Sequence, residues 1–360
     1  MSSSSTLSPH PKVSICLPTC DRPELIATCI DSCLAQSYGE LEIVIGDDSK
    51  DARTEQLIAT RYAREPRVRY ARNQPSLGQA RNVASLFERA SGDKILLIHD
   101  DDLLTTDGVE KLVSLWTLHP QLDAAFGDQY EADHGGAIDF AASAHLNAAF
   151  RRTKDAEGLQ SLPGRTGLIQ MFPNNGWMAN AALVKRIGYK KEYGVCCDFV
   201  FGTELCLAAR EVFYLHDYVS VYRKTASSVS HSTRGTAVAA TVSAYAFVKA
   251  LKLPAQLEPS RKLALRRLAP IVVSVHAKNR QALAGFKVAF AHLFAYNYGL
   301  SARLYYHLLM LARGTLSARQ QAVAAAAVAA VTAAPVVAAD PAAVVKELVS
   351  ELVSDRSEPV

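Results

Sequence analysis

Hydrophobic runs alternate with amphipathic segments along the first hundred residues. Four segments have the apolar character of strands: residues 12–18 (KVSICLP), 41–48 (LEIVIGDD), 67–73 (RVRYARN) and 94–102 (KILLIHDDD). The segments between them place apolar residues at helical spacing. This alternation predicts an α/β fold with a mostly parallel central sheet and helices on both faces.

Two of the intervening helices have recognisable ends. Asp21, Pro23 and Glu24 form an acidic, proline-containing start with the spacing of a capping box. In residues 76–92 (SLGQARNVASLFERASG), Gly92 is expected to end the helix. Residues 134–170 show no clear period, so we expect an irregular insertion or a loop there.

Composition narrows the class of protein. The chain has 360 residues, 49% of them hydrophobic and 21% charged, which is typical of a globular protein. Its 39 basic and 35 acidic residues give a net charge of +4, too small an excess to indicate nucleic acid as a partner. We interpret the seven cysteines as reduced structural residues, because Cys16 lies in an apolar strand and Cys29 and Cys33 share an apolar helix face, and this favours a reducing cytoplasm.

No segment reads as a signal or a membrane span. The N-terminus lacks the basic and apolar regions of a secretory signal, and we expect a disordered tail at residues 1–11. Residues 321–339 are rich in alanine and valine but are interrupted by Pro335, so they make a poor membrane span.

Acidic residues follow two of the predicted strands. Asp47 and Asp48 end one strand, and Asp100, Asp101 and Asp102 end another. Adjacent carboxylates repel one another and lose hydration when they are buried, so three in a row indicate a place where water or a cation neutralises them. Oxygen ligands suit Mg²⁺ or Mn²⁺, and both ions bridge to phosphates. The open ends of parallel strands are where α/β proteins bind ligands, and the pattern therefore predicts a site for a nucleoside diphosphate.

These motifs together resemble a known family. Residues 12–51 (KVSICLPTCDRPELIATCIDSCLAQSYGELEIVIGDDSKD), LGQARNVA and ILLIHDDDLL are similar to the nucleotide-binding half of family 2 glycosyltransferases of the GT-A fold. A weaker similarity extends through DFVFGTELCLAAREVFYLHDYVSVYR, to about residue 224. The resemblance implies an inverting, metal-dependent transferase that uses a nucleotide-diphosphate sugar.

The resemblance also implies roles for individual residues. The implied nucleotide-sugar-binding residues are Pro18, Thr19, Arg22, Asp47, Asp48, Arg81 and Asp100. Asp100, Asp101 and Asp102 match the metal motif of the family, with Asp101 preferred as the direct ligand. His99 stands where relatives often have another acid.

Asp198 is the candidate general base, because it opens a helical stretch where relatives carry theirs. A structural helix cap is the competing interpretation for this residue, and Glu204 is the alternative base. Trp177 and Asn180 fall where the acceptor side would begin, although packing under the sheet is an equally good role for Trp177. Beyond them, Thr225 replaces a histidine of the family, and His231 is a weaker metal or phosphate candidate.

The resemblance sets expectations for the whole chain. We expect a catalytic domain at residues 12–235, divided into a nucleotide-binding half (12–105) and an acceptor half (106–235), then a helical region (236–315) and an Ala/Val-rich tail (316–360). The expected reaction moves a sugar to a hydroxyl of a glycan or lipid-linked acceptor in cell-surface polysaccharide synthesis, in the cytoplasm. We expect the C-terminal helices to pack on the catalytic domain, because amphipathic helices mostly face their own core, and dimer contact and peripheral contact with the inner membrane are the alternatives. A sugar nucleotidyltransferase and an inactive nucleotide-sugar-binding protein remain as alternatives.

Overall fold

The computed structural model describes residues 10–133, 135–225 and 234–313, without the side chains of 234–239. Three predictions fall outside these ranges: the N-terminal tail up to residue 9, His231, and the tail after residue 315. The chain divides into two compact units, Met1–Val272 and Val273–Val360. Within the described residues, no helix is long and apolar enough to cross a bilayer.

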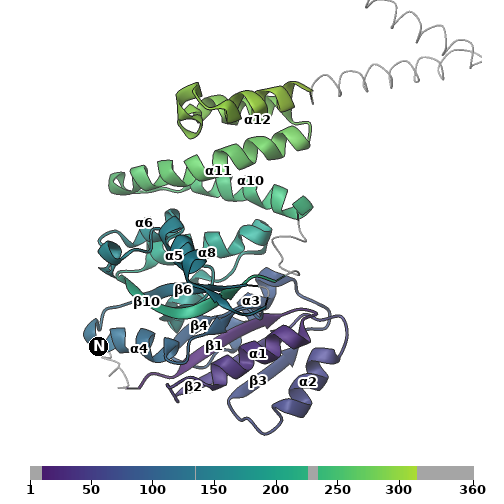
Figure 1. The fold of residues 1–360 in the computed structure, drawn as a ribbon, viewed down its shortest axis with the longest axis vertical. Coiled ribbons are helices and arrows are strands. Elements are labelled where there is room, and N and C mark those ends of the chain that lie inside the picture. Colours follow the sequence, from purple (N-terminus) through teal and green to yellow (C-terminus); the bar gives the residue numbers. More distant parts are fainter. Residues whose placement is uncertain (1–9, 134, 226–233, 314–360) are drawn as a thin grey trace, which may run out of the picture. The chain divides into compact units, whose positions relative to one another are not determined.

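A single mixed sheet forms the centre of the first unit (Figure 1). Its strands are β1 (Val13–Thr19), β2 (Leu41–Asp47), β3 (Val68–Arg72), β4 (Lys94–Leu97), β5 (Leu103–Leu104), β6 (Ala124–Ala132), β7 (Ile138–Asp139), β8 (Gly158–Leu159), β9 (Trp177–Asn180) and β10 (Val212–Arg223). The main strand order is β3-β2-β1-β4-β9-β6-β10-β5. β9 runs antiparallel to β4 and β6, and β5 runs antiparallel to β10, while the other strands on this path share one direction. The predicted mostly parallel sheet is therefore confirmed.

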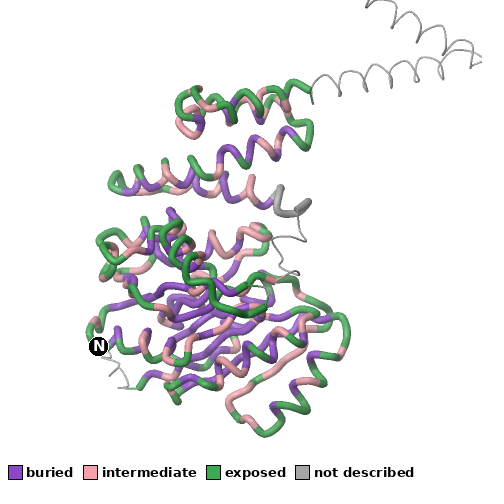
Figure 2. Tube along the Cα trace, in the orientation of Figure 1, coloured by how far each residue is buried: buried purple, intermediate pink, exposed green. Residues whose placement is uncertain are grey.

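Helices cover both faces of the sheet. They are α1 (Pro23–Leu34), α2 (Arg53–Arg61), α3 (Gln79–Arg89), α4 (Gly108–Leu118), α5 (Phe140–Ala149), α6 (Pro163–Leu168), α7 (Ala181–Ile187) and α8 (Cys197–Ala208). Two further helices follow in the chain, α10 (Arg234–Ala250), which contacts α8, and α11 (Glu258–Lys278). One apolar core joins the sheet to α1, α2 and α4, and a second joins it to α3, α7 and α8. Figure 2 shows the strands buried between these two helix layers. Cys16, Cys29 and Cys33 are fully buried in these cores as free thiols, as expected.

The second unit is helical, and the predicted C-terminal helices are present. It contains the end of α11, α12 (Ala282–Ala291), the 3₁₀ segment η4 (Leu293–Gly299) and a helix over residues 302–313. A small core that includes Tyr296 and Leu311 holds these helices together, and Tyr296 Oη lies 2.7 Å from His307 Nδ1.

Asp21 and Gly92, which we expected at helix ends, have other roles. Asp21 does not cap α1, whose N-cap is Arg22; it joins two loops instead, because its Oδ1 accepts a hydrogen bond from Lys50 N at 2.9 Å. Gly92 does not end α3, whose C-cap is Ala90. A side chain at Gly92 would lie 2.6 Å from the carbonyl oxygen of Lys12, so the glycine allows the chain to pass close to β1.

Residues 134–170 are more regular than we expected. They contain α5, α6 and the 3₁₀ segment η1 (Lys154–Ala156). The buried residues of α5 are Ser143 and Asn147, so this helix docks through hydrogen bonds and leaves no apolar stripe. The hydrophobic pattern missed it for this reason.

Candidate active site

A cavity of about 1680 Å³ opens at the carboxyl ends of β1, β2 and β4. Its lining includes residues from both expected halves of the catalytic domain. The predicted site residues among them are Pro18, Thr19, Arg22, Asp48, Asp100, Asp101, Asp102 and Asp198. Asp47 and Arg81 are absent from the lining.

Asp100 is tied to the end of β1. Its Oδ2 accepts a hydrogen bond from Thr19 Oγ1 at 2.7 Å, and its Oδ1 pairs with Arg22 Nη1 at 3.0 Å. The same Arg22 nitrogen pairs with Asp101 Oδ2 at 3.0 Å. Burial raises the pKa of Asp100, and Arg22 opposes that rise. Asp100 therefore lies with the predicted nucleotide residues.

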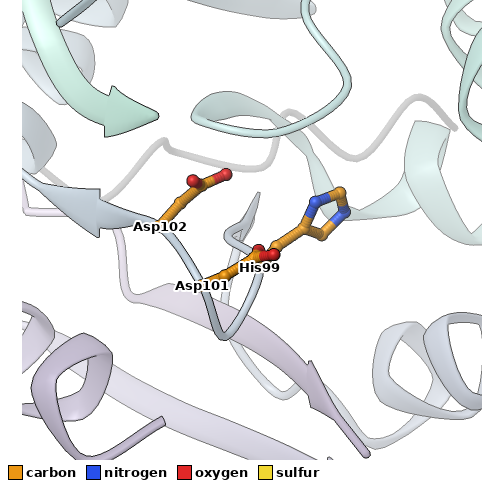
Figure 3. Close-up of side chains that lie close together, drawn as sticks. All are labelled: His99, Asp101 and Asp102. Carbon is orange, nitrogen blue, oxygen red and sulfur yellow. The ribbon is translucent and has the colours of Figure 1, made fainter. Parts of the chain in front are cut away.

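His99, Asp101 and Asp102 form a second cluster. One ligand atom from each lies within 4.8 Å of the others, and Figure 3 shows the three side chains on the loop after β4. Burial and the neighbouring Asp101 raise the pKa of Asp102. This cluster differs from the three consecutive aspartates that the sequence indicates, because His99 replaces Asp100.

Distant elements fix the orientation of Asp102. Asn175, just before β9, donates from Nδ2 to Asp102 Oδ2 at 2.7 Å and lies 2.9 Å from His99 Nδ1. The backbone N–H of Arg223, at the end of β10, donates to Asp102 Oδ1 at 2.9 Å. Asn175 was not predictable from the sequence, because an isolated asparagine carries no pattern of its own.

The acidic pair after β2 separates into two roles. Asp47 is fully buried and accepts hydrogen bonds from Ser49 N at 2.8 Å and Tyr70 Oη at 2.6 Å. Asp48 accepts from the N–H of Gly78 at 2.7 Å, where the backbone φ of 76° suits glycine. Asp48 therefore holds the loop before α3 at the cavity wall, whereas Asp47 stabilises its own turn. Arg81 lies exposed on the first turn of α3.

Asp198 enters the cavity from α8. Its Oδ1 accepts a hydrogen bond from Tyr189 Oη at 2.8 Å, and no described residue donates to its Oδ2. The N-cap of α8 is Cys196, so Asp198 lies inside the first turn and does not occupy the cap position. Burial raises the pKa of Asp198, and both His99 and the Tyr189 hydrogen bond oppose the rise. The alternative base, Glu204, forms an ion pair with Lys190 at 2.6 Å and does not line the cavity.

Trp177, which we expected near the acceptor side, does not line the cavity. Trp177 is fully buried against Phe87, Phe172 and Phe201, so its role is packing under the sheet. Asn180 accepts a hydrogen bond from Lys94 Nζ at 2.5 Å, at the opposite end of β4 from the cavity. Thr225 lines the cavity, and its buried Oγ1 has no hydrogen-bond partner among the described residues.

Comparison with known proteins shows what part of the chain is similar to a family. The family model described as Glycosyl transferase family 2 matches residues 14–174. A chondroitin synthase of Escherichia coli is 35% identical over 108 residues, which cover 30% of this chain and 16% of the relative. The chain spans about a third or less of the length of the curated relatives it matches.

Two solved structures share the fold. TarS 1–349 of S. aureus in complex with UDP-GlcNAc aligns with a TM-score of 0.56 and 15% identity, over 86% of this chain and 92% of that one. The mannosyltransferase PcManGT of Pyrobaculum calidifontis in complex with GDP-Man and Mn²⁺ aligns with a TM-score of 0.53 and 16% identity, over 86% and 87%. The central sheet with its flanking helices is thus of the GT-A type, and residues 14–174 are similar to glycosyl transferase family 2.

Proposed function

We propose that this protein is an inverting, metal-dependent glycosyltransferase that moves a sugar from a nucleotide-diphosphate donor to a hydroxyl of a glycan or lipid-linked acceptor. One observation carries the proposal: a single cavity is lined by the Arg22 and Asp100 pair, the His99, Asp101 and Asp102 cluster, and Asp198. Similar proteins include a chondroitin synthase and structures bound to UDP-GlcNAc and GDP-Man, which supports a sugar nucleotide as the donor.

The ends of β1 and β2 are proposed to bind the nucleoside. Thr19 and Arg22 already hold Asp100 at this wall, so its carboxylate is oriented before a ribose arrives. Asp48 keeps the loop at Gly78 in place through its hydrogen bonds, and Pro18 borders the same space. The positions of Asp47 and Arg81 give them indirect roles, in the turn after β2 and on the outer surface of α3.

The cluster of His99, Asp101 and Asp102 fits a divalent cation. Imidazole and carboxylate ligands suit Mn²⁺, and carboxylates suit Mg²⁺. Burial and the neighbouring Asp101 raise the pKa of Asp102, and a bound cation would favour its charged form. When bound there, the cation would neutralise negative charge on the diphosphate leaving group. Asn175 and Arg223 would hold Asp102 in position for it.

Asp198 is the proposed general base. As the acceptor oxygen forms its bond to the anomeric carbon, the bond from that carbon to the diphosphate breaks and the hydroxyl proton passes to Asp198. Attack from the face opposite the leaving group inverts the configuration. Tyr189 occupies Oδ1 and leaves Oδ2 for the acceptor, while the raised pKa makes the carboxylate a better proton acceptor.

The second unit is the proposed contact with a membrane surface. It exposes Tyr298, Leu300, Tyr305 and Tyr306. Its described residues, 273–313, contain no Asp or Glu although Lys and Arg recur, whereas the acidic residues of this unit occur only after residue 339. Two copies of a cationic surface repel each other, whereas an anionic bilayer attracts one. Lipid contact is thus better supported than a homodimer through these helices.

A screen of donors tests the proposed function. Purified protein is heated with UDP-, GDP- and dTDP-sugars, with and without Mn²⁺, and the melting temperature is recorded. We expect one nucleotide series to raise the melting temperature more with Mn²⁺ than without it, and slow hydrolysis of that donor. No shift with any donor would contradict the proposal. Pyrophosphate release from a nucleoside triphosphate and a sugar 1-phosphate would instead support a nucleotidyltransferase.

A further inference from the structure

The charges that line the cavity are segregated by sign. Apart from Asp198, its acidic residues come from positions 21–102, the side proposed to hold the cation and the nucleotide. Residues 146–175 and α11 contribute the cations Arg152 and Arg267 to the lining. Arg22 is already paired with Asp100 and Asp101, and Lys224 is paired with Glu131. Arg152 and Arg267 are thus the lining cations for which, among the described residues, no ion pair forms.

Arg152 is buried to an unusual degree for a cation. Only 3% of the residue is exposed, and no described residue accepts a hydrogen bond from its Nε. Burial lowers its pKa to about 10, although Asp128 and Tyr214 favour the charged form. Asp128 is itself engaged by Tyr214 Oη at 2.7 Å and His216 Nδ1 at 3.0 Å. A buried guanidinium with unused donors is costly unless an anion completes it.

The side chain of Arg152 is held in a fixed position. Its Nη1 donates to Gln129 Oε1 at 3.1 Å, and Gln129 Nε2 donates to Asn175 Oδ1 at 3.3 Å. Asn175 also binds Asp102, so a continuous chain of hydrogen bonds connects Arg152 to the proposed metal cluster. Such fixed donors reduce the entropy lost when a ligand binds.

Arg267, like Arg152, lies near the ring of Phe150. The guanidinium carbons of Arg152 and Arg267 are 5.5 and 5.3 Å from the centroid of the Phe150 ring. Arg267 Nη1 donates to the carbonyl oxygen of Ile169 at 3.0 Å, which leaves its other nitrogens available. Burial and the neighbouring Arg151 lower the pKa of Arg267. A bound anion would relieve the repulsion between Arg267 and Arg151.

We propose that Arg152 and Arg267 form an acceptor subsite for an oxyanion, so that the acceptor glycan carries a carboxylate or a phosphate next to the hydroxyl that is glycosylated. The planar guanidinium group matches both anions with paired hydrogen bonds. The donor's own diphosphate is assigned to the acidic, cation-binding side of the cavity, and this separation favours the acceptor as the source of the anion. The inference rests on the proposed function and specifies its acceptor class.

Direct binding tests this subsite with simple probes. Glucuronic acid and glycerol 1-phosphate are compared with their neutral counterparts, glucose and glycerol, by ligand-observed NMR. Saturating UDP or GDP with Mn²⁺ fills the donor side first. We expect at least one anion to bind about tenfold or more tightly than its neutral counterpart. Preference for glucuronic acid identifies a sugar-acid acceptor, and preference for glycerol phosphate identifies a phosphorylated one.

Three variants locate the binding. Arg267→Gln and Arg152→Gln should weaken the anion about tenfold or more, whereas Arg266→Gln, an exposed neighbour on α11 outside the lining, should not change it. Arg267 is the more exposed of the two, so its variant serves even if Arg152→Gln fails to fold. Equal affinity for neutral and anionic probes, or equal losses in Arg266→Gln and Arg267→Gln, would overturn the subsite. Nucleotide binding is measured in the same samples. If the unmodified protein binds UDP or GDP with Mn²⁺ but shows no preference for the anionic probe, only the subsite is wrong. If it does not bind UDP or GDP at all, the proposed function is wrong as well.

Discussion

Asp100 and Asp101 share Arg22 as a partner but differ in their other neighbours, and this difference predicts different losses of binding. Asp101 belongs to the proposed metal cluster, whereas Asp100 is held by Thr19 and Arg22. We expect Asp101→Asn to weaken Mn²⁺-dependent nucleotide binding by at least about tenfold, and Asp100→Asn to weaken nucleotide binding with and without the metal. Titration of UDP and GDP with and without Mn²⁺ measures both effects.

The fold should survive both changes. Each substitution removes one negative charge from a repelling group, so the melting temperature without metal should stay the same or rise. Asp51→Asn, in the exposed loop after β2, is the matched control. If Mn²⁺ still strengthened nucleotide binding in Asp101→Asn as it does in the unmodified protein, Asp101 would not be a ligand.

Glu42 should make stability depend on acidic pH. Burial raises its pKa, but hydrogen bonds from Ser14, Ser91, Arg69 and Lys12 outweigh burial and lower the pKa to about 2, from an ordinary 4.5. The stabilisation is therefore complete above about pH 4.5 and is lost as the pH falls toward about 2, and it amounts to roughly 2–3 kcal/mol. Urea unfolding at several pH values should show Glu42→Gln less stable at pH 7 and less sensitive to pH in this window. A Glu42→Gln profile parallel to that of the exposed Glu40→Gln control would contradict this.

Site residues could be predicted from the sequence where several of them stand next to one another. Asp100, Asp101 and Asp102 stand out because three carboxylates follow a buried strand, and Asp198 was found through the family resemblance. Asn175, Arg152 and Arg267 were missed, because each is a single polar residue far along the chain from the aspartates. Their importance depends on contacts formed only in the fold.

At the scale of elements, α5 shows how a helix docks through polar contacts. Asn147 Nδ2 donates to the carbonyl oxygen of Gln129 at 2.9 Å, and its Oδ1 accepts from Gln129 N at 3.1 Å. Asn147→Ala would leave both buried backbone groups of β6 without partners, so we expect a loss of about 2–3 kcal/mol in the free energy of unfolding. Urea unfolding measures the loss. His145→Ala, on the exposed side of α5, should change stability by less than about 0.5 kcal/mol, and a similar value for Asn147→Ala would contradict this docking role.

Helices and strands could be predicted from the sequence where they bury apolar side chains. The strands around Ile15, Ile43 and Ile95 and the helix that contains Cys29 carry a clear hydrophobic pattern, and each is present. α5 carries none. The direction of β9 was also not predictable, because residues 177–180 have no feature that distinguishes an antiparallel insertion between β4 and β6.

At the scale of the whole molecule, the second unit should bring the protein to anionic membranes. We expect the full-length protein to sediment with phosphatidylglycerol vesicles at low salt, and less with phosphatidylcholine vesicles or at high salt. Reversing two exposed cations of this unit, Lys287→Glu with Arg303→Glu, should reduce binding at least about tenfold. The matched control, Arg64→Glu with Lys191→Glu, changes exposed residues of the first unit. Equal binding to both vesicle types would argue against the lipid contact.

The central claim is that this molecule catalyses sugar transfer with Asp198 as the base, and Asp198→Asn tests it most directly. Asparagine keeps the size of the side chain and a hydrogen-bond acceptor for Tyr189 but cannot take up the proton. Single-turnover transfer, or donor hydrolysis before an acceptor is identified, is measured with saturating donor and Mn²⁺, alongside Glu204→Gln as the control. For Asp198→Asn we expect a rate that is lower by about a hundredfold or more, with unchanged nucleotide affinity. For Glu204→Gln we expect a near-normal rate. Transfer by Asp198→Asn at the unmodified rate would contradict the central claim.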